Sequence, residues 1–137
     1  MAAHNGGKLH QIDVKSAFLN GDLKEEVFLT QPQGFEVEGK EHKVCKLIKA
    51  LYDLKQAPRA WYAKIDEYLR KVCFQWSESE DTLYFRMQYK HFVIIVVYVD
   101  DLIITRNNED HIKKVKGELQ PSFKMTDLGT LHYYLRV

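Results

Sequence analysis

The segment Phe92-Val-Ile-Ile-Val-Val-Tyr-Val-Asp-Asp-Leu-Ile-Ile-Thr105 contains two apolar runs joined by the dipeptide Asp100-Asp101. Apolar runs separated by two residues predict a β-hairpin, and the length and β-branched residues of 92–99 predict a buried strand. The central residues of such a turn usually need positive φ, which favours glycine over two carboxylates. Like charges placed this close repel each other, and desolvation adds to the cost. A divalent cation would relieve that cost, because hard cations bind carboxylate oxygens.

A third acid, Asp13, follows the apolar-flanked segment Leu9-His-Gln-Ile12. An isolated Asp-Asp turn is more often purely structural, since Asp is a common turn residue. Asp13 by itself would serve equally well as a helix N-cap. Two neighbouring strands of one sheet could nevertheless bring all three carboxylates together. They could then hold two Mg²⁺ ions, the arrangement that polymerases use for nucleotidyl transfer.

The rest of the chain alternates between strand and helix patterns, without a linker or repeat. We expect a short turn or helix at 17–20, a helix that starts near Pro58, and a second helix between Asn107-Asn108 and Pro121. An apolar face at helical spacing supports the first long helix; it comprises Trp61, Ile65, Tyr68, Leu69 and Val72. Further strands are predicted at 9–13, 26–31, 44–47, 83–87 and 131–137. This mixture predicts an α+β domain with helices packed on one face of a mainly antiparallel sheet.

Composition describes one ordinary globular domain. The chain has 137 residues, 45% hydrophobic and 28% charged, with a net charge of +1, so any nucleic-acid surface must be local. Cys45 and Cys73 are too few and too far apart for a disulfide framework or metal site, which predicts free thiols in a reducing compartment. No run approaches the ~18 apolar residues of a membrane span, and the N-terminus lacks the apolar h-region of a signal peptide. We therefore expect an intracellular protein that is neither secreted nor membrane-bound.

Four motifs occur in a fixed order along the chain: Gln11-Ile-Asp-Val-Lys-Ser-Ala-Phe-Leu-Asn-Gly21, Gln31-Pro-Gln-Gly-Phe35, Leu54-Lys-Gln-Ala-Pro-Arg59 with Trp61-Tyr62, and Tyr98-Val-Asp-Asp101. A lone Tyr-x-Asp-Asp is weak evidence, but this combination resembles the reverse transcriptase domain of copia-type LTR retrotransposons over essentially all 137 residues. The resemblance implies an RNA-directed DNA polymerase of the palm type. It also implies a Pol polyprotein as the parent protein, located in a cytoplasmic virus-like particle or the nucleus.

The resemblance assigns roles to named residues. Asp13, Asp100 and Asp101 would bind two Mg²⁺ (or Mn²⁺) ions and be the catalytic acids, with Asp13 and Asp100 the better candidates for direct ligands. Backbone N–H groups of Ser16 and Ala17 would meet the triphosphate. Phe18 would lie under the sugar and exclude a 2′-hydroxyl, although most phenylalanines are core residues.

A basic and aromatic cluster forms a second candidate surface; it comprises Lys43, Lys46, Lys49, Lys55 and Arg59 with Tyr52, Trp61 and Tyr62. Bases could stack on the rings while the cations meet phosphates. A solvated basic edge is the alternative, and we favour a core role for Trp61 and Tyr62. The resemblance makes Lys55, Gln56 and Arg59 substrate contacts. More weakly, it gives Lys124 a role in pyrophosphate departure and places 131–137 at the start of the primer grip.

Several positions depart from the family pattern. Asp53, Cys73, Arg106 and Arg136 stand where the family usually has glycine, and Gly7 stands where it usually has tryptophan. Asp53 would place bulk and negative charge close to a triphosphate. Such scatter is typical of a decaying genomic copy.

Residues 1–137 are therefore interpreted as one partial reverse transcriptase domain, a palm with part of the fingers, with the fingers and thumb largely missing. The expected partners are an RNA or DNA template with primer, deoxynucleoside triphosphates and the rest of the Pol polyprotein. Because positioning dominates phosphoryl transfer, we expect the isolated chain to be inactive. A non-catalytic nucleic-acid-binding relic is one alternative. A structural α+β domain whose carboxylates fail to converge is the other.

Overall fold

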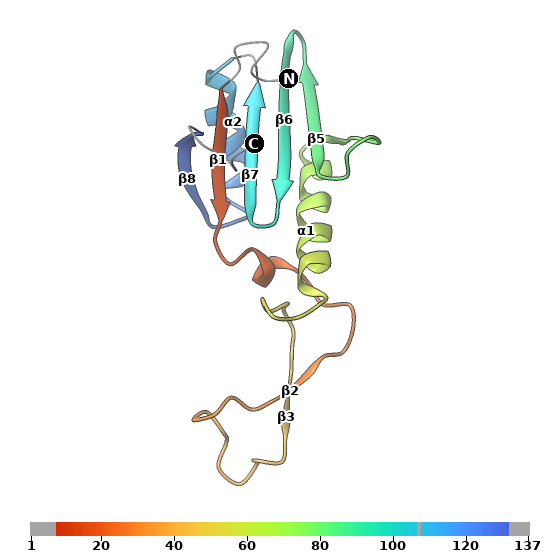
Figure 1. Ribbon diagram of the computed structural model, residues 1–137, viewed down its shortest axis with the longest axis vertical. Coiled ribbons are helices and arrows are strands. Elements are labelled where there is room, and N and C mark those ends of the chain that lie inside the picture. Colours follow the sequence, from red (N-terminus) through yellow and green to blue (C-terminus); the bar gives the residue numbers. More distant parts are fainter. Residues whose placement is uncertain (1–7, 107, 132–137) are drawn as a thin grey trace. The chain divides into compact units, whose positions relative to one another are not determined.

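The computed structural model describes residues 8–106 and 108–131, which form two compact units (Figure 1). The sheet unit holds the described residues up to Ala17 and from Ile65 onward, and the hairpin unit holds Phe18–Lys64. In chain order the elements are β1 (Leu9–Val14), a 3-10 turn (Ala17–Asn20), β2 (Phe28–Thr30), β3 (Val44–Lys46), α1 (Ala57–Lys71), β4 (Gln75–Trp76), β5 (Leu83–Gln88), β6 (His91–Tyr98), β7 (Asp101–Arg106), α2 (Asp110–Leu119) and β8 (Met125–Thr130).

The sheet unit is built on six strands in the order β4-β5-β6-β7-β1-β8, and every neighbouring pair is antiparallel. The middle of the sheet is the β6–β7 hairpin with β1 added along β7 (Figure 1). The α+β class and the antiparallel sheet predicted from the sequence are confirmed. Among the described residues, neither helix is long and apolar enough to cross a bilayer.

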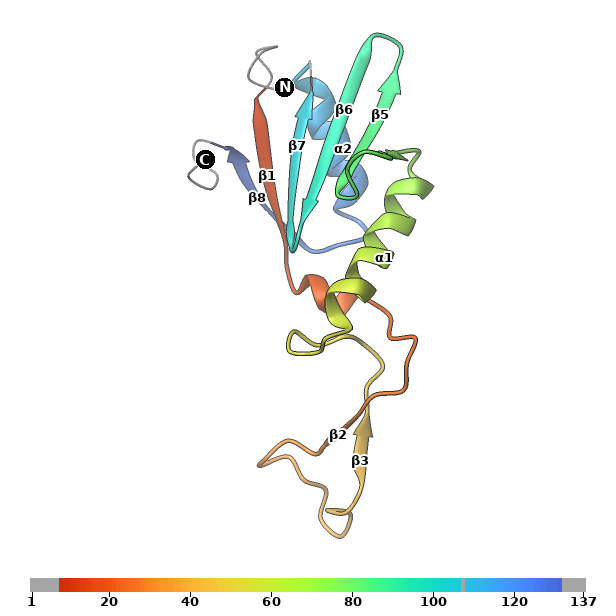
Figure 2. The ribbon, with the colours of Figure 1, turned by 45° about the vertical axis from the view of Figure 1, so that its right-hand side comes forward.

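Both helices of the sheet unit, α2 and the second half of α1, pack on one face of this sheet (Figure 2). The covered face carries alternate strand residues that are at most 4% exposed: Ile12, Val14, Val93, Ile95, Val97, Leu102 and Ile104. Ile112, Val115 and Leu119 of α2 and Ile65 and Leu69 of α1 complete this core. The intervening β6 residues Ile94 and Val96 are only half-buried. The prediction of a fully buried strand was therefore wrong for one face, because no described helix covers it.

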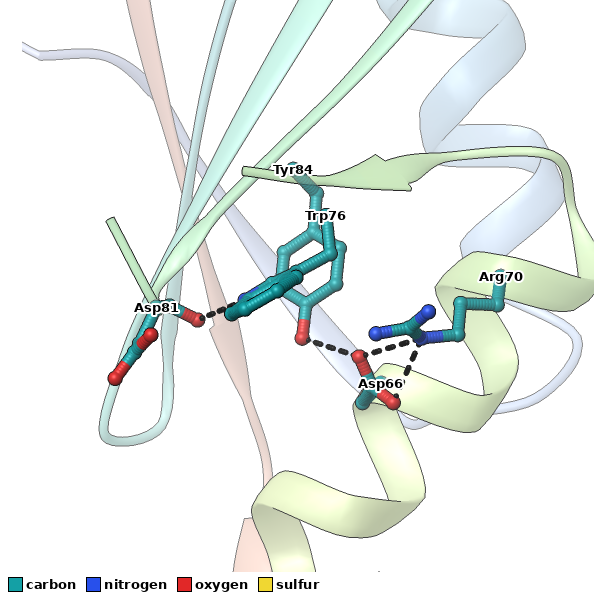
Figure 3. Close-up of polar contacts among 5 residues, drawn as sticks. All are labelled: Asp66, Arg70, Trp76, Asp81 and Tyr84. Atoms are coloured by element: carbon teal, nitrogen blue, oxygen red, sulfur yellow. Dashed lines mark hydrogen bonds and ion pairs between the residues drawn. The ribbon is translucent and has the colours of Figure 1, made fainter. Parts of the chain in front are cut away.

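Helix α1 is tied to β5 by polar contacts around Asp66 (Figure 3). The Tyr84 hydroxyl donates to Asp66 Oδ1 over 2.7 Å, and Arg70 Nε donates to both carboxylate oxygens of Asp66, one turn earlier in the helix. Trp76 Nε1 donates to the carbonyl oxygen of Asp81 and closes the loop between β4 and β5. These bonds satisfy the polar atoms at the helix–sheet contact, which matters because Tyr84 is fully buried.

The hairpin unit contains the β2–β3 ribbon and the first part of α1. Its most restrictive contact is at Gly21, where an added Cβ would lie 2.7 Å from the carbonyl carbon of Ala60 and 2.7 Å from the nitrogen of Trp61. Glycine is needed there so that the loop backbone can touch the helix backbone. Trp61 is 1% exposed, which confirms its expected core role, and Tyr62 is half-buried.

Most predicted elements are present with shifted ends. The strands at 9–13, 26–31, 44–47 and 83–87 correspond to β1, β2, β3 and β5, and the first helix begins at Ala57, next to Pro58. Asn108 Oδ1 accepts a hydrogen bond from the Asp110 N–H at the start of α2, while Asn107 lies outside the described residues. The predicted strand at 131–137 also falls outside them, except for Leu131, which is not in a strand. Strands β4 and β8 were missed.

Helix α1 ends in a Schellman motif. The Phe74 N–H donates to the Leu69 carbonyl and the Cys73 N–H donates to the Arg70 carbonyl. The motif requires a left-handed residue, and Cys73 takes that place with φ +67°. The resemblance implies glycine at this position, which is the residue that a left-handed backbone favours. Both Cys45 and Cys73 are free and exposed, as expected.

We therefore expect Cys73→Gly to raise the free energy of unfolding by about 1 kcal/mol, since a side chain costs roughly that much in the left-handed region. Urea denaturation of the two chains measures the difference. Cys73→Ala is the matched control, because it removes the thiol and keeps Cβ. A gain of equal size in Cys73→Ala would show that the thiol, and not the backbone, carries the cost.

Arg106 is the buried charge of the sheet unit. Its side chain lies on the covered face at the end of β7, opposite Val93, and only 4% of the residue is exposed. None of its guanidinium nitrogens has a hydrogen-bond partner among the described residues. Burial lowers the pKa of Arg106, and the charges of Asp110 and Glu109 only partly oppose that effect. Arg106 is therefore a buried cation without a hydrogen-bond partner among the described residues, at a position where the resemblance implies glycine.

The charge of Arg106 contributes to the lowered pKa of two histidines, His10 and His111. Burial, then the charge of Lys116 and, more weakly, that of Arg106, lower the pKa of His10. Burial, then His91 and Arg106, lower the pKa of His111, whose ring lies 4.7 Å from that of His91. When the pKa is lowered in the folded state, the unfolded chain binds more protons below pH 6.5, the ordinary histidine value. Stability contributed by these groups is therefore lost as the pH falls below that value.

Replacing Arg106 with methionine should raise the free energy of unfolding at pH 7.5 by about 1–3 kcal/mol, because an unsatisfied buried cation is removed. The loss of stability between pH 7.5 and pH 5.5 should also become smaller, since one cause of the lowered pKa of His10 and His111 is gone. Denaturation at both pH values checks this, with the exposed Lys71→Met as control. An Arg106→Met chain less stable than the natural one would contradict the reading.

Candidate metal centre

Three carboxylates converge at one end of the sheet, on the face that no described helix covers. Asp13 of β1 is the register partner of Asp101, the first residue of β7. Asp100 lies in the turn before β7, and its carbonyl accepts the Val14 N–H over 2.8 Å. One carboxylate oxygen of each acid lies within 4.8 Å of one from the other two. Residues 87 positions apart in sequence are thus brought together by antiparallel pairing, as expected from the strand pattern.

The turn that carries the acids differs by one residue from the prediction. Strand β6 ends at Tyr98, the turn residues are Val99 and Asp100, and Asp101 already pairs with Tyr98. The positive φ falls on Val99, at +53°, and not on Asp100. A type I′ turn, which needs positive φ at both central residues, is therefore excluded. A β-branched residue in the left-handed region is strained, and such strain is typical of functional turns.

The pKa of Asp13 is raised by burial, and further by the charges of Asp100 and Asp101. The positive charge of Lys15 opposes this shift. The pKa rises chiefly because burial disfavours the charged carboxylate, and secondarily because folding brings two further negative charges close to it. All three acids remain half-buried, so their oxygens are accessible to a small cation.

This donor set suits a hard divalent cation. Carboxylate oxygens are the preferred protein ligands of Mg²⁺, which keeps several waters and takes one or two carboxylates. No histidine or cysteine joins the described cluster, which excludes the donor pattern of a structural zinc site here. A bound cation would also remove the repulsion that raises the pKa of Asp13.

The other expected phosphate contacts of the sheet unit lie just after β1. Ser16 is exposed with φ +50°, and Ala17 is fully buried at the start of the 3-10 turn. Lys15 stands two residues from Asp13 but is not among the site residues predicted from the sequence. Its N–H donates to the Lys124 carbonyl over 2.9 Å, which brings a second lysine to the same end of the sheet.

The remaining predicted substrate residues belong to the hairpin unit. Phe18 is 5% exposed, and its ring meets the Tyr52 ring edge-on, with centroids 4.4 Å apart. This packing fits the alternative in which Phe18 is a core residue. Lys55 and Arg59 are exposed, and Gln56 is half-buried. Gln56 and Arg59 line one cavity of about 130 Å³, whose lining also includes Asp22.

The basic cluster is partly neutralised within the hairpin unit. Asp22 pairs with Lys49 and, over 3.2 Å, with Lys64, while Lys46 pairs with Glu26 over 2.6 Å. Sequence reasoning missed Asp22, since nothing near it in the chain points to Lys49 or Lys64. Two of the five cations expected to meet phosphates therefore already have acidic partners, which favours a solvated edge for that part.

Comparison with known proteins shows which family the chain belongs to. The chain is 48% identical over 130 residues to the retrovirus-related Pol polyprotein from transposon TNT 1-94 of Nicotiana tabacum, covering 94% of this chain and 10% of that protein. It is 39% identical over 137 residues to the Pol polyprotein from transposon RE1 of Arabidopsis thaliana, covering 100% of this chain and 9% of that protein. It is 38% identical over 124 residues to the putative transposon Ty5-1 protein of Saccharomyces cerevisiae, covering 90% of this chain and 40% of that protein.

The chain thus spans about a tenth of the length of the two plant polyproteins. The family model described as reverse transcriptase (RNA-dependent DNA polymerase) matches residues 1–137 without remainder. With this match along the whole sequence, the chain belongs to the reverse transcriptase family, in a form shared with retrotransposon Pol polyproteins.

Proposed function

We propose that residues 1–137 are the palm and part of the fingers of a copia-type reverse transcriptase, with Asp13, Asp100 and Asp101 as the acids of a two-metal centre. The observation that supports this most is the convergence of these three carboxylates on adjacent strands of a chain from this family. Two bound Mg²⁺ or Mn²⁺ ions would lower the pKa of a primer 3′-hydroxyl and stabilise the pyrophosphate leaving group.

The acids have separate tasks in this proposal. Asp13 and Asp100 are the direct ligands. Asp101, at the start of β7, adds a negative charge beside them that also attracts the cations. The strand register sets their spacing, so little reorganisation is needed when a cation arrives. The strained turn at Val99 fixes the direction of Asp100 relative to Asp13.

Substrate contacts follow the family pattern. Backbone N–H groups of Ser16 and Ala17 would meet the triphosphate, and Phe18 would limit the sugar to a deoxyribose. Lys55, Gln56 and Arg59 would contact template and nucleotide. The proposed partners are primed RNA or DNA, deoxynucleoside triphosphates and the other parts of the Pol polyprotein.

We further propose that the 137-residue chain alone is inactive. Phosphoryl transfer depends on holding primer, template and nucleotide in line, and these residues amount to about a tenth of the plant polyproteins. Exposed Asp53 also places a negative charge in the segment that precedes the proposed substrate residues.

A non-catalytic nucleic-acid-binding relic is the second candidate. Strained Cys73 favours it, as does buried Arg106, which has no hydrogen-bond partner in the described part of the chain. Both residues destabilise the fold at positions where the resemblance implies glycine.

The metal centre predicts cation binding that depends on the acids. Mn²⁺ titration followed by electron paramagnetic resonance should show binding that Asp13→Asn and Asp100→Asn each weaken by about tenfold or more. Glu67→Gln, an exposed acid on α1, should leave it unchanged. Binding should also weaken from pH 7.5 to pH 5, since the raised pKa of Asp13 lets protons compete earlier. Equal affinities in all chains would refute the centre.

Primer extension on poly(rA)/oligo(dT) with Mg²⁺ or Mn²⁺ tests the activity, with Asp100→Asn as the comparison. We expect no incorporation by the natural chain above that of the variant, because the substrates are not held in line. Incorporation that disappears in Asp100→Asn would overturn the proposed inactivity and establish a working centre. Salt-sensitive binding of the duplex that survives in Asp100→Asn would support the relic instead.

A further inference from the structure

Three histidines and one arginine gather on the covered face of the sheet, at the end away from the acids. This histidine–arginine cluster comprises His10, His91, Arg106 and His111. Strand β7 begins at the acids and runs the length of the sheet before it ends at Arg106 (Figure 1). Because side chains alternate along a strand, His10 lies on the face of buried Ile12, and His91 on the face of buried Val93.

The strand register brings these side chains within reach of one another. Arg106 is the register partner of Val93, so His91, two residues along β6, is its diagonal neighbour on the same face. The register of β1 with β7 likewise makes His10 a diagonal neighbour of Arg106 on the other side. Helix α2 adds His111, whose ring lies 4.7 Å from the His91 ring, centroid to centroid. The charge of Arg106 acts on both His10 and His111.

The nitrogens of the histidine–arginine cluster are buried without hydrogen-bond partners among the described residues. They are all three guanidinium nitrogens of Arg106, both ring nitrogens of His10, and Nδ1 of His91 and of His111. In the described part of the chain, seven of the eight buried side-chain polar atoms of this kind belong to the cluster. Native structures leave few buried polar groups unsatisfied, and a bound ion is one explanation of an exception. Because a guanidinium can only donate and a neutral imidazole carries one N–H, the partner that fits this site is an acceptor.

A small anion fits the cluster better than a cation or an internal ion pair. Asp110 and Glu109 are the acids whose charges act on Arg106, but neither accepts a hydrogen bond from it, and Glu109 pairs with Lys8 over 2.7 Å. A transition metal would use the imidazole lone pairs, and the charge of Arg106 repels it. The neighbouring residues along the strands and the helix are apolar and at most 4% exposed: Val93, Ile104 and Ile112. In such surroundings an opposite charge interacts strongly with the guanidinium, and burial favours the smallest anion.

We propose that the histidine–arginine cluster binds a monatomic anion, such as chloride, through the guanidinium of Arg106 and the imidazoles around it. The anion accepts their hydrogen bonds and neutralises the buried cation of the described core. It thereby joins β6, β7 and the first turn of α2, so chloride is a structural ligand that stabilises the sheet unit. The site lies at the other end of the sheet from the acids and does not depend on the proposed metal centre.

Urea denaturation in sodium chloride and in sodium gluconate of equal ionic strength tests this. Gluconate is too large for a buried site, and equal ionic strength keeps the screening of charges the same. With a dissociation constant of about 10 mM, about 100 mM chloride should lower the equilibrium constant of unfolding roughly tenfold. Arg106→Met should lose this dependence, and His111→Phe, which keeps a ring but removes the N–H, should at least halve it. Lys71→Met, at an exposed position, is the matched control and should keep it.

The NMR line width of chloride gives a direct second readout. The folded natural chain and Asp100→Asn should broaden the resonance equally, and Arg106→Met should not. Equal chloride dependence of stability in Arg106→Met and the natural chain overturns the inference, since a general salt effect would then explain it. A folded natural chain that does not respond to chloride overturns it as well, because Arg106 is then satisfied within the protein. Broadening that persists in Arg106→Met has the same meaning, since the anion then binds elsewhere.

Discussion

The pairing of β1 with β7 is the constraint on which the rest of the sheet unit depends. In one register, Ile12 faces Leu102 in the core while the next pair, Asp13 and Asp101, faces outward. Because side chains alternate with a period of two, a slip of β1 by one residue would turn Asp13 into the core, away from Asp101, and would expose Ile12. The same pattern that builds the core therefore also gathers the carboxylates. One alternating pattern of residues thus specifies both the core and the candidate centre.

The backbone holds these acids together although their negative charges repel one another. The Val14 N–H bond to the Asp100 carbonyl and the left-handed Val99 hold the acids close while they repel each other. Exposed Lys15 adds a positive charge beside these acids, and this charge opposes the rise in the pKa of Asp13. Such a separation of charge suits a ligand that itself combines cations with an anion.

Much of this arrangement could be predicted from the sequence, and the failures have physical reasons. Apolar runs and β-branched residues identified β6 and β7, and helical spacing identified the buried face of α1. The turn was placed one residue late, because the Asp13 register and not local turn preference decides where β7 begins. Strand β8 was missed since Asp127 and Gly129 disfavour strand locally, and only pairing with β1 stabilises it. The ion pairs of Asp22 depend on contacts that no local pattern reports.

Positions that favour glycine differ in how well they tolerate a side chain. Cys73 stands where the backbone asks only for a left-handed φ, and there a side chain is admitted at a cost in strain. Gly21 has no such latitude, because the space for its Cβ is occupied by the main chain of Ala60 and Trp61. A side chain at the first kind of position strains the backbone but leaves the packing in place. A side chain at Gly21 would push the loop away from the helix backbone.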